Sequence, residues 1–179
     1  RSSAGSSEEP KNVKVTNLSD SSFTVTYQTD AVTTGSFNYG KSKELGNTQL
    51  EDIPKNVHSL TAEKLSPDTK YYLVVISGQN TFLNNGVPFE ISTAPTISSP
   101  SAVRSQVKGK VILPDGNAPN EALVYLNTDN SQLLSAAVTK DGEFNFSLKG
   151  FRTNDLSSYF DVSENTVLKL FAISNSLKS

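Results

Sequence analysis

The sequence predicts an all-β chain that forms two tandem antiparallel Greek-key β-sandwich domains. Apolar and polar residues alternate over short runs, as in residues 23–27, where Phe, Val and Tyr are separated by threonines. Such alternation is typical of half-buried strands. Clusters of Gly, Pro, Asn and Asp separate the runs, and helical periodicity is nearly absent. Many short strands at this spacing favour sandwiches over other all-β folds.

The chain divides into two blocks of similar size. Residues 1–9 are polar and predict a flexible leader, and residues 10–95 form the first predicted sandwich. Residues 96–102, rich in Pro and Ser, predict a linker, and residues 103–179 form the second sandwich. The chain contains no methionine, and we expect it to be part of a longer protein.

In the first block, six runs predict strands, and residues 41–56 predict a loop with weak edge strands. The turns between the runs contain Ser66-Pro67-Asp68 and Asn84-Asn85-Gly86. The predicted strands lie at residues 13–15, 23–27, 37–39, 60–62, 71–77 and 87–91.

In the second block, two Asp-Gly pairs mark tight turns, because Gly tolerates a positive φ. These pairs are Asp115-Gly116 and Asp141-Gly142. Residues 149–161 are polar and predict an irregular segment. The predicted strands lie at residues 107–113, 122–126, 133–139, 144–148 and 166–174.

The charge and cysteine content excludes several classes of function. The 179 residues carry a net charge of −2, and basic residues do not cluster, so the field that nucleic acids or anionic membranes require is missing. The chain has no cysteine, which excludes disulfides and cysteine-ligated metals. No apolar run is long enough to span a bilayer.

Residues 65–71, LSPDTKY, resemble the L-x-P-x-T-x-Y stretch of fibronectin type III domains. In that family the tyrosine, here Tyr71, forms a structural tyrosine corner whose hydroxyl bonds to nearby backbone. Residues 13–27 and 88–95 extend the resemblance, although Tyr27 stands where many members have a core tryptophan. The resemblance covers residues 10–95.

Residues 107–148 resemble a second family, the carboxypeptidase regulatory-like or transthyretin-like domain. The family reads T-x-x-D-G-x-F-x-F, and the corresponding residues here are 139–146, TKDGEFNF, which follow an A-x-V-x-L run at residues 122–126. Both families are common in modular extracellular proteins. The resemblance therefore implies an extracellular or cell-surface location, with targeting and anchor segments outside this chain.

Residues that could carry chemistry favour structural interpretations. His58 is the only histidine and shares a strand face with Leu60 and Ala62, so we interpret it as a core residue. No nucleophile motif or zinc ligand set is present, and we expect no enzymatic activity, no metal site and no cofactor. The candidates for calcium do not form a dense ladder of acids, and turn chemistry explains Asp115 and Asp141; the candidates are Asp115 with Asn117, Asp129 with Asn130, and Asp141 with Glu143.

Two further possibilities rest on few residues. Some transthyretin-like repeats join a lysine of the first strand to an asparagine of the last, which here means Lys108 or Lys110 with Asn175, assisted by Glu164. We prefer to interpret the lysines as a solvated strand face. Aromatic side chains could form a carbohydrate platform, and the candidates are Tyr72, Phe82, Tyr125 and Tyr159.

The candidate interface is an apolar stripe on the outward face of residues 71–77. The resemblance to fibronectin type III domains implies that Tyr71 faces the core, and the alternation then places Leu73 and Val75 inward as well. Tyr72, Val74 and Ile76 are left facing outward. A solvated face is normally polar, so this stripe predicts a covering partner. Residues 166–174 are apolar on both faces as well. We hypothesise that one of these two surfaces forms the domain contact; the alternative is local cover by residues 41–56 or 149–161.

The sequence as a whole favours non-catalytic structural, adhesion or spacer modules of a larger bacterial cell-surface or secreted protein. The alternative is an accessory region of an extracellular enzyme, with carbohydrate binding as its role, whose catalytic domain lies outside this chain. Expected partners are neighbouring domains of the same polypeptide and an unknown protein or glycan. Nucleic acid binding and membrane insertion are not expected.

Overall fold

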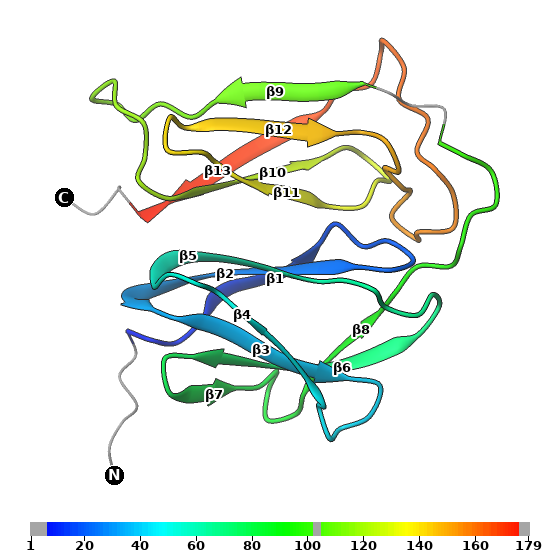
Figure 1. The fold of residues 1–179 in the computed structure, drawn as a ribbon. Coiled ribbons are helices and arrows are strands. Elements are labelled where there is room, and N and C mark those ends of the chain that lie inside the picture. The colour runs from blue at the N-terminus through cyan, green and yellow to red at the C-terminus, as the bar shows by residue number, and fades with distance from the viewer. Residues whose placement is uncertain (1–6, 102–104, 176–179) are drawn as a thin grey trace.

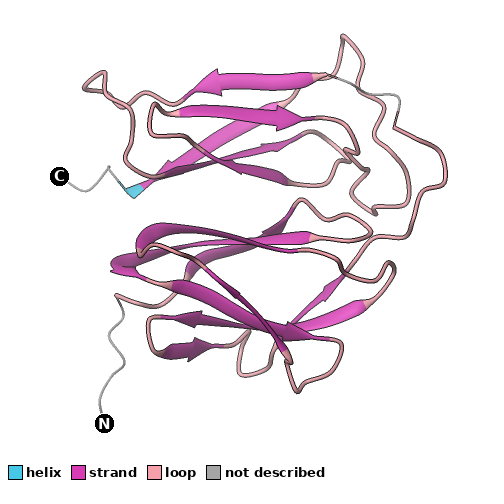
Figure 2. Cartoon of the chain, viewed as in Figure 1, coloured by secondary structure: helices cyan, strands magenta, loops and turns pink. Residues whose placement is uncertain are grey.

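The structure, a computed structural model, describes residues 7–101 and 105–175. All named elements in this part of the chain are strands, joined by loops (Figure 2). Their bounds are β1 Lys11–Thr16, β2 Phe23–Thr33, β3 Gly35–Gly40, β4 Asn47–Leu50, β5 Lys55–Ala62, β6 Lys70–Ser77, β7 Asn80–Phe82, β8 Phe89–Ser92, β9 Gln106–Lys110, β10 Ala122–Asn127, β11 Leu134–Ala137, β12 Glu143–Ser147 and β13 Lys169–Ser174. The described residues contain no helix of the length and apolarity needed to cross a membrane.

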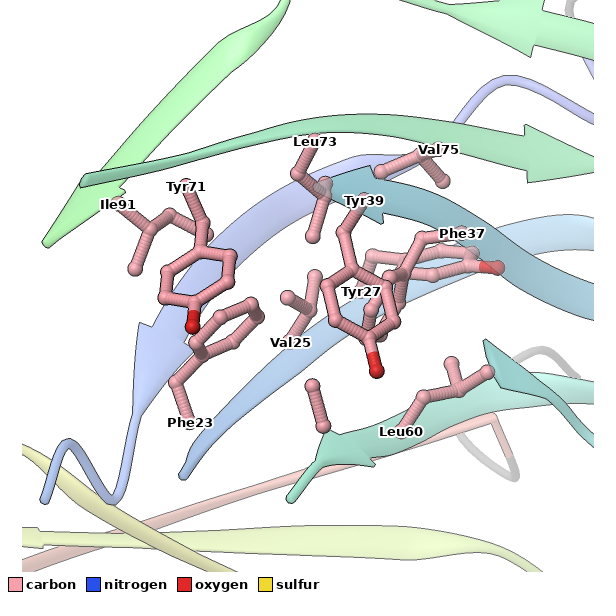
Figure 3. Close-up of a cluster of buried hydrophobic side chains, with 11 residues drawn as sticks. Phe23, Val25, Tyr27, Phe37, Tyr39, Leu60, Tyr71, Leu73, Val75 and Ile91 are labelled. Atoms are coloured by element: carbon pink, nitrogen blue, oxygen red, sulfur yellow. The ribbon is translucent and has the colours of Figure 1, made fainter. Parts of the chain in front are cut away.

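The first sandwich packs a three-stranded sheet on a larger one. The order β1-β2-β5 faces the order β4-β3-β6-β7, and β8 also pairs with β6. All pairs are antiparallel. The buried core between the sheets is rich in aromatic rings (Figure 3), and it comprises Phe23, Val25, Tyr27, Phe37, Tyr39, Leu60, Ala62, Tyr71, Leu73, Val75 and Ile91. The predicted inward phase of β6 is thereby confirmed.

Several strand boundaries of the first sandwich differ from the sequence prediction: β2 continues to Thr33, and β7 was not predicted. The strand predicted at 60–62 begins at Lys55, and the weakly patterned region before it contributes β4. The strand predicted at 87–91 begins at Phe89, because residues 84–87 form a tight hairpin turn. Asn85 and Gly86 have φ of 51° and 86°, as a type I′ turn requires.

The second sandwich is smaller. Its three-stranded sheet, β11-β10-β13, packs against the two-stranded sheet β12-β9. Phe146, Leu148 and Phe151 meet Val124 and Leu126 in its core. The predicted first strand ends at Lys110 and does not reach 113, and the last begins at Lys169 rather than 166.

The two sandwiches are stacked through their three-stranded sheets, so that the molecule has four sheet layers (Figure 1). A side-chain hydrogen bond joins β1 to β11, another joins β2 to β10, and apolar contacts join β5 to β13. One end of the stack holds a cleft lined by Lys11, Asn56 and Ser174. The first strand of the chain therefore begins, and the last ends, at the same end of the stack.

Candidate functional site

The contact between the two sandwiches is the most elaborate site in the described part of the chain. Its centre is apolar: Val57 of β5 packs with Leu123 and Tyr125 of β10 and with the half-buried Leu133 and Ile173. Tyr125 is 0% exposed and stacks on Phe171 of β13, with ring centroids 4.8 Å apart. Burial of this kind stabilises a domain contact by the same hydrophobic effect that stabilises a core.

A stripe of threonines forms the first sandwich's side of this contact. Thr16, Thr24 and Thr26 lie on the face of β1 and β2 that points away from the aromatic core, yet they are 1%, 3% and 0% exposed. Thr26 Oγ1 lies 2.6 Å from the Tyr125 hydroxyl, and Thr16 Oγ1 lies 2.7 Å from Ser135 Oγ. The hydroxyls of Thr16 and Thr26 therefore have partners across the interface, and Thr24 Oγ1 lies 2.8 Å from Thr61 Oγ1 within the first sandwich, so all three are paired as burial demands.

Asn17 holds one end of the interface. Its side-chain amide donates to the Ser135 carbonyl at 3.1 Å, and its side-chain oxygen accepts from the Ser135 amide at 3.0 Å. Its own backbone amide donates to the Leu133 carbonyl at 3.1 Å. Asn17 has a φ of 54°, a conformation that asparagine adopts more easily than most residues. This turn residue thus binds the edge of β11 as a paired strand would.

Glu121 holds the other end. Its Oε2 accepts from the backbone amides of Asn56 and Val57 at 2.8 and 2.9 Å. These amides begin β5, so a carboxylate of the second sandwich caps an edge strand of the first. Charge-assisted bonds of this type are stronger than neutral ones.

Arg152 fixes the connection between the domains. It is 4% exposed, and its Nη1 donates to the Pro95 carbonyl at 2.7 Å and to the Leu156 carbonyl at 2.9 Å. Pro95 is the last residue of the predicted first domain. The segment that leaves the first sandwich is therefore bonded to the second.

The structure separates the two surfaces that the sequence offered for the domain contact. Tyr72, Val74 and Ile76 lie on β6, in the sheet that faces away from the second sandwich, so assigning the domain contact to them is wrong. Val74 is 6% exposed, and Lys43 lies over the Tyr72 ring at 6.0 Å from its centroid. Residues 41–56 thus supply part of the local cover. Binding of another partner to this stripe stays a prediction.

The other surface contributes to the contact. Ile173 of β13 packs into the interface cluster, and Phe171 stacks on Tyr125. The physical reason that β6 is not used is its place in the fold, because β6 is central in the outer sheet of the stack.

Tyr71 occupies the position expected of a tyrosine corner. Its ring is buried in the first core, and its hydroxyl accepts a hydrogen bond from the Ser66 amide at 2.8 Å. Thr93 adds a second clasp, because its hydroxyl donates to the Ser66 carbonyl at 2.6 Å. These bonds fix the crossover that leads into β6.

His58 lies in a buried polar cluster at the opposite end of the same core. Its Nδ1 is 2.7 Å from Glu51 Oε2, and its Nε2 is 2.9 Å from Thr29 Oγ1. A carboxylate, an imidazole and a hydroxyl in this order are the groups of a catalytic triad. His58 and Thr29 are only 0% and 5% exposed, so a substrate cannot reach the hydroxyl. The cluster joins β2, β5 and the segment before β5.

Tyr27 stacks on His58 with ring centroids 4.4 Å apart. Burial, and secondarily the negative charge of Glu51, raise the pKa of the Tyr27 hydroxyl well above its usual range. The Ser36 backbone lies near enough to oppose this rise in pKa weakly, but the hydroxyl has no hydrogen-bond partner of good geometry among the described residues. Gly35 lies directly against the cluster: a Cβ there would lie 2.6 Å from Glu51 Oε2, His58 Nδ1 and the Tyr27 oxygen.

The remaining sequence candidates lie apart from one another. Asn175 bonds to Asn56 of the first sandwich at 3.4 Å, whereas Lys108 and Lys110 line a groove on the β9–β12 sheet. The structure therefore does not bring together the lysine and asparagine of the proposed covalent bond. Glu164 lies in the loop before β13 and is exposed.

Two of the acidic residues considered for calcium are engaged in other contacts. Asp115 Oδ1 accepts from the Asn117 amide at 2.9 Å, and Asp129 pairs with Lys169 at 2.7 Å. These bonds lower the pKa of both carboxyls. The described residues contain no group of three acidic or histidine side chains that could hold a metal ion.

Comparisons of the chain with known proteins find a similarity among solved structures alone. No family model and no curated protein matches it. Among solved structures it is similar to a two-domain fibronectin type III segment from chicken tenascin. The identity is 13%, the match covers 90% of this chain and 98% of that chain, and the TM-score is 0.31.

The strand order itself shows what kind of fold this is. A three-stranded sheet packed on a five-stranded sheet, closed by the Tyr71 corner, makes the first domain an immunoglobulin-like sandwich, the class that includes fibronectin type III domains. The whole described chain is all-β with antiparallel sheets.

Sequence reasoning missed most of the docking site. The alternation in β2 indicated a half-buried strand with the threonines opposite the core, but polarity alone does not tell a solvated face from a hydrogen-bonded one. One signal was present: β-branched threonines recur on one face of β2, where a solvated strand more often carries charged residues.

Proposed function

We propose that this chain is a non-catalytic structural module of a larger bacterial cell-surface or secreted protein, in which two docked sandwiches act as one stiff unit. The single observation that carries the proposal is the docking interface, with an apolar centre and a polar clamp at each end, Asn17 and Glu121. The second sandwich would be of the carboxypeptidase regulatory-like type. Such a unit would hold or present neighbouring parts of its polypeptide at a fixed angle.

Backbone relaxation measured by NMR on the full chain tests the rigid unit. Docked sandwiches tumble together, so we expect one rotational correlation time for both. Two distinct correlation times would contradict the proposal, because they would show that the sandwiches reorient independently.

Cell labelling tests the location separately. Antibodies raised against the chain should label intact cells of the source organism or its culture medium. Labelling that requires permeabilised cells would contradict an extracellular role while leaving the rigid unit intact.

The accessory role in carbohydrate binding has less support. Of the aromatic residues considered as platforms, Tyr125 is buried in the interface and Tyr159 is stacked by Arg152 at 5.9 Å. Phe82 packs on the first core. A glycan array probed with the full chain separates the two functions, because selective binding of one glycan class would favour the accessory role.

A further inference from the structure

Free sheet edges are places where another strand can add, because their backbone groups lack partners. Most edges of this molecule carry a feature that opposes such pairing. The pairing of β1 shifts register between Lys11 and Lys14. Four strands are only three or four residues long, namely β4, β7, β8 and β11. The β9–β12 sheet presents Lys108, Lys110 and Glu143.

The outer edge of β5 is blocked by carboxylates. Glu121 accepts from the amides of Asn56 and Val57, and Glu51 Oε1 accepts from the amide of Ser59 at 3.2 Å. A strand arriving at this edge would have to displace both side chains.

The edge strand β13 has none of these protections. Its six residues pair with β10 without a register shift, and it contains no proline. Its one charged residue, Lys169, is at its first position and is bound to Asp129 at 2.7 Å. Among the described residues, no other strand pairs with residues 169–173 on their outer side. Long, apolar and unshifted edges are those most ready to pair.

The side chains of β13 are more exposed than their partners on β10, which shows that β13 lacks a neighbouring strand on its outer side within the described part of the chain. Leu126 and Tyr125 of β10 are each 0% exposed, whereas their ladder partners Leu170 and Phe171 are 46% and 44% exposed. Leu126 faces the second core and Tyr125 faces the domain interface, so Leu170 and Phe171 lie on opposite faces of the sheet. A layer on one face would cover only one of them. A strand beside β13 would flank both.

We propose that β13 pairs antiparallel with β13 of a second copy of this chain, which joins two three-stranded sheets into one. An antiparallel pair is two-fold symmetric, so one edge can be its own complement. The axis must be normal to the sheet, which keeps each residue on its own face. Phe171 and Ala172 are the two central residues of the six-residue strand, so a pairing centred on either of them uses most of the edge. Either register places the two copies of Lys169 at opposite ends of the ladder, where their charges do not repel.

A second observation favours a copy of the same chain over a foreign strand. A two-fold axis normal to the sheets sets the two stacks side by side, layer by layer, so their β5 sides also meet. That side carries a shallow groove along β5, lined by Leu50 and Ile53, which are 65% and 64% exposed. With Val167, Leu170 and Phe171, this side holds five of the nine exposed large apolar side chains of the described residues. Such clustering marks an interaction surface.

Sedimentation of the full chain over a range of concentrations tests the proposal. We expect a monomer–dimer equilibrium, and we expect Leu170→Lys to raise the dissociation constant at least tenfold, because it places a charge beside the new ladder. The control is Val87→Lys, a valine that is 58% exposed at the opposite edge of the outer sheet, which should leave the equilibrium unchanged. A chain that stays monomeric at about 1 mM, a concentration that reveals even weak association, would overturn the proposal, as would a dimer unaffected by Leu170→Lys.

Single cysteines provide a test that does not depend on the lysine variant. The chain has no cysteine, so a single introduced thiol can form a disulfide only with the same residue of a second molecule. Opposite residues of an antiparallel pair fall in the range that a disulfide spans, whereas diagonal neighbours are about 7–8 Å apart. We expect oxidation to link Phe171→Cys or Ala172→Cys, but not Leu170→Cys, Ile173→Cys or the control Val87→Cys. Equal linking at all positions, or none at the two central ones, would overturn the proposal.

Discussion

At the residue scale, Gly35 is the described glycine of the first sandwich with the least room for a side chain. Its missing side chain allows Glu51, His58 and the Tyr27 hydroxyl to meet in a buried cluster, and its own amide donates to Glu51 Oε2 at 3.1 Å. No positive φ is involved, so the constraint is space alone.

The change Gly35→Ala should lower the free energy of unfolding by about 1–3 kcal/mol, because the added methyl would overlap three polar atoms that cannot move into solvent. Thermal denaturation should show a fall of roughly 2–4 °C per kcal/mol. The control is Gly46→Ala, where a Cβ would have nothing within 4 Å and little change is expected. Equal melting temperatures for the two variants would show that the cluster is not tightly packed.

A second residue-scale prediction concerns the two core tyrosines, which differ in their hydroxyl partners. Tyr27→Phe should leave stability at pH 7 unchanged or raise it, because it removes a buried hydroxyl without a partner. Tyr71→Phe should cost about 1 kcal/mol, because it removes the bond from the Ser66 amide. Chemical denaturation of both variants measures the difference. A loss for Tyr27→Phe as large as that for Tyr71→Phe would contradict the assignment of partners.

Alkaline pH should increase the difference in stability between the original chain and Tyr27→Phe. Because its folded pKa is raised above the unfolded value of about 10, the folded state holds this proton more tightly than the unfolded state. The corresponding stability is complete below about pH 10 and is lost as the pH rises further. Between about pH 9 and pH 11, the free energy of unfolding should therefore fall more for the original chain than for Tyr27→Phe, as chemical denaturation at the two pH values would measure. Parallel losses would indicate that Tyr27 ionises normally when folded.

The sequence predicted part of this cluster. The period of two placed His58 on the buried face with Leu60 and Ala62, and all three are buried. Glu51 was not found, because it lies in a segment without alternation and its burial depends on a long-range contact. Local pattern reports the face of a strand but not which distant loop folds over it.

At the element scale, the turn between β1 and β2 and the start of β5 determine how the sandwiches meet. The turn residue Asn17 binds the backbone of β11, and Glu121 binds the backbone of β5. Both side chains form hydrogen bonds with backbone groups of an edge strand. Docking therefore also covers two edges that could otherwise pair with a strand of another molecule.

Removing the Asn17 side chain should loosen one end of the interface. Asn17→Gly keeps the positive φ accessible while removing both bonds to Ser135, and we expect a loss of about 1–2 kcal/mol. Hydrogen exchange should show the Ser135 amide losing protection first. The matched control is Asn85→Gly, with a φ of 51° in an exposed hairpin turn, which should retain that protection. An unchanged exchange rate at Ser135 in Asn17→Gly would argue against the clamp.

Element positions were predicted better than element contacts. The runs at 23–27, 71–77 and 122–126 all lie in strands. Apolar outward residues offered the β6 stripe and residues 166–174 as docking surfaces, and only the second takes part, whereas the first sandwich docks through threonines, two of whose hydroxyls pair across the interface. Apolarity identifies a covered face only when the cover is itself apolar.

At the scale of the whole molecule, the four layers make the tandem compact rather than extended. A compact chain of 179 residues has a radius of gyration of about 16 Å. Two sandwiches joined end to end would exceed that value.

Small-angle scattering of Val57→Asp should detect the loss of docking. Val57 is 6% exposed in the interface cluster, and an unpaired carboxylate there would be strongly disfavoured. We expect the radius of gyration to rise while each sandwich stays folded. Val32→Asp changes a valine that is 63% exposed and should leave the scattering curve unchanged. A compact Val57→Asp variant would show that the apolar centre does not hold the domains together.

The position of Lys11 and Ser174 in one cleft determines how this molecule would respond to tension. A pull applied through these two points would not stretch the stack along its strands. It would separate the two sandwiches at the cleft while the segment around Pro95 acts as a hinge, because Arg152 bonds to the Pro95 carbonyl there. The Glu121 bonds near the cleft would rupture first and those of Asn17 last, one row at a time. The joint between the sandwiches would therefore yield at low force, before either sandwich unravels.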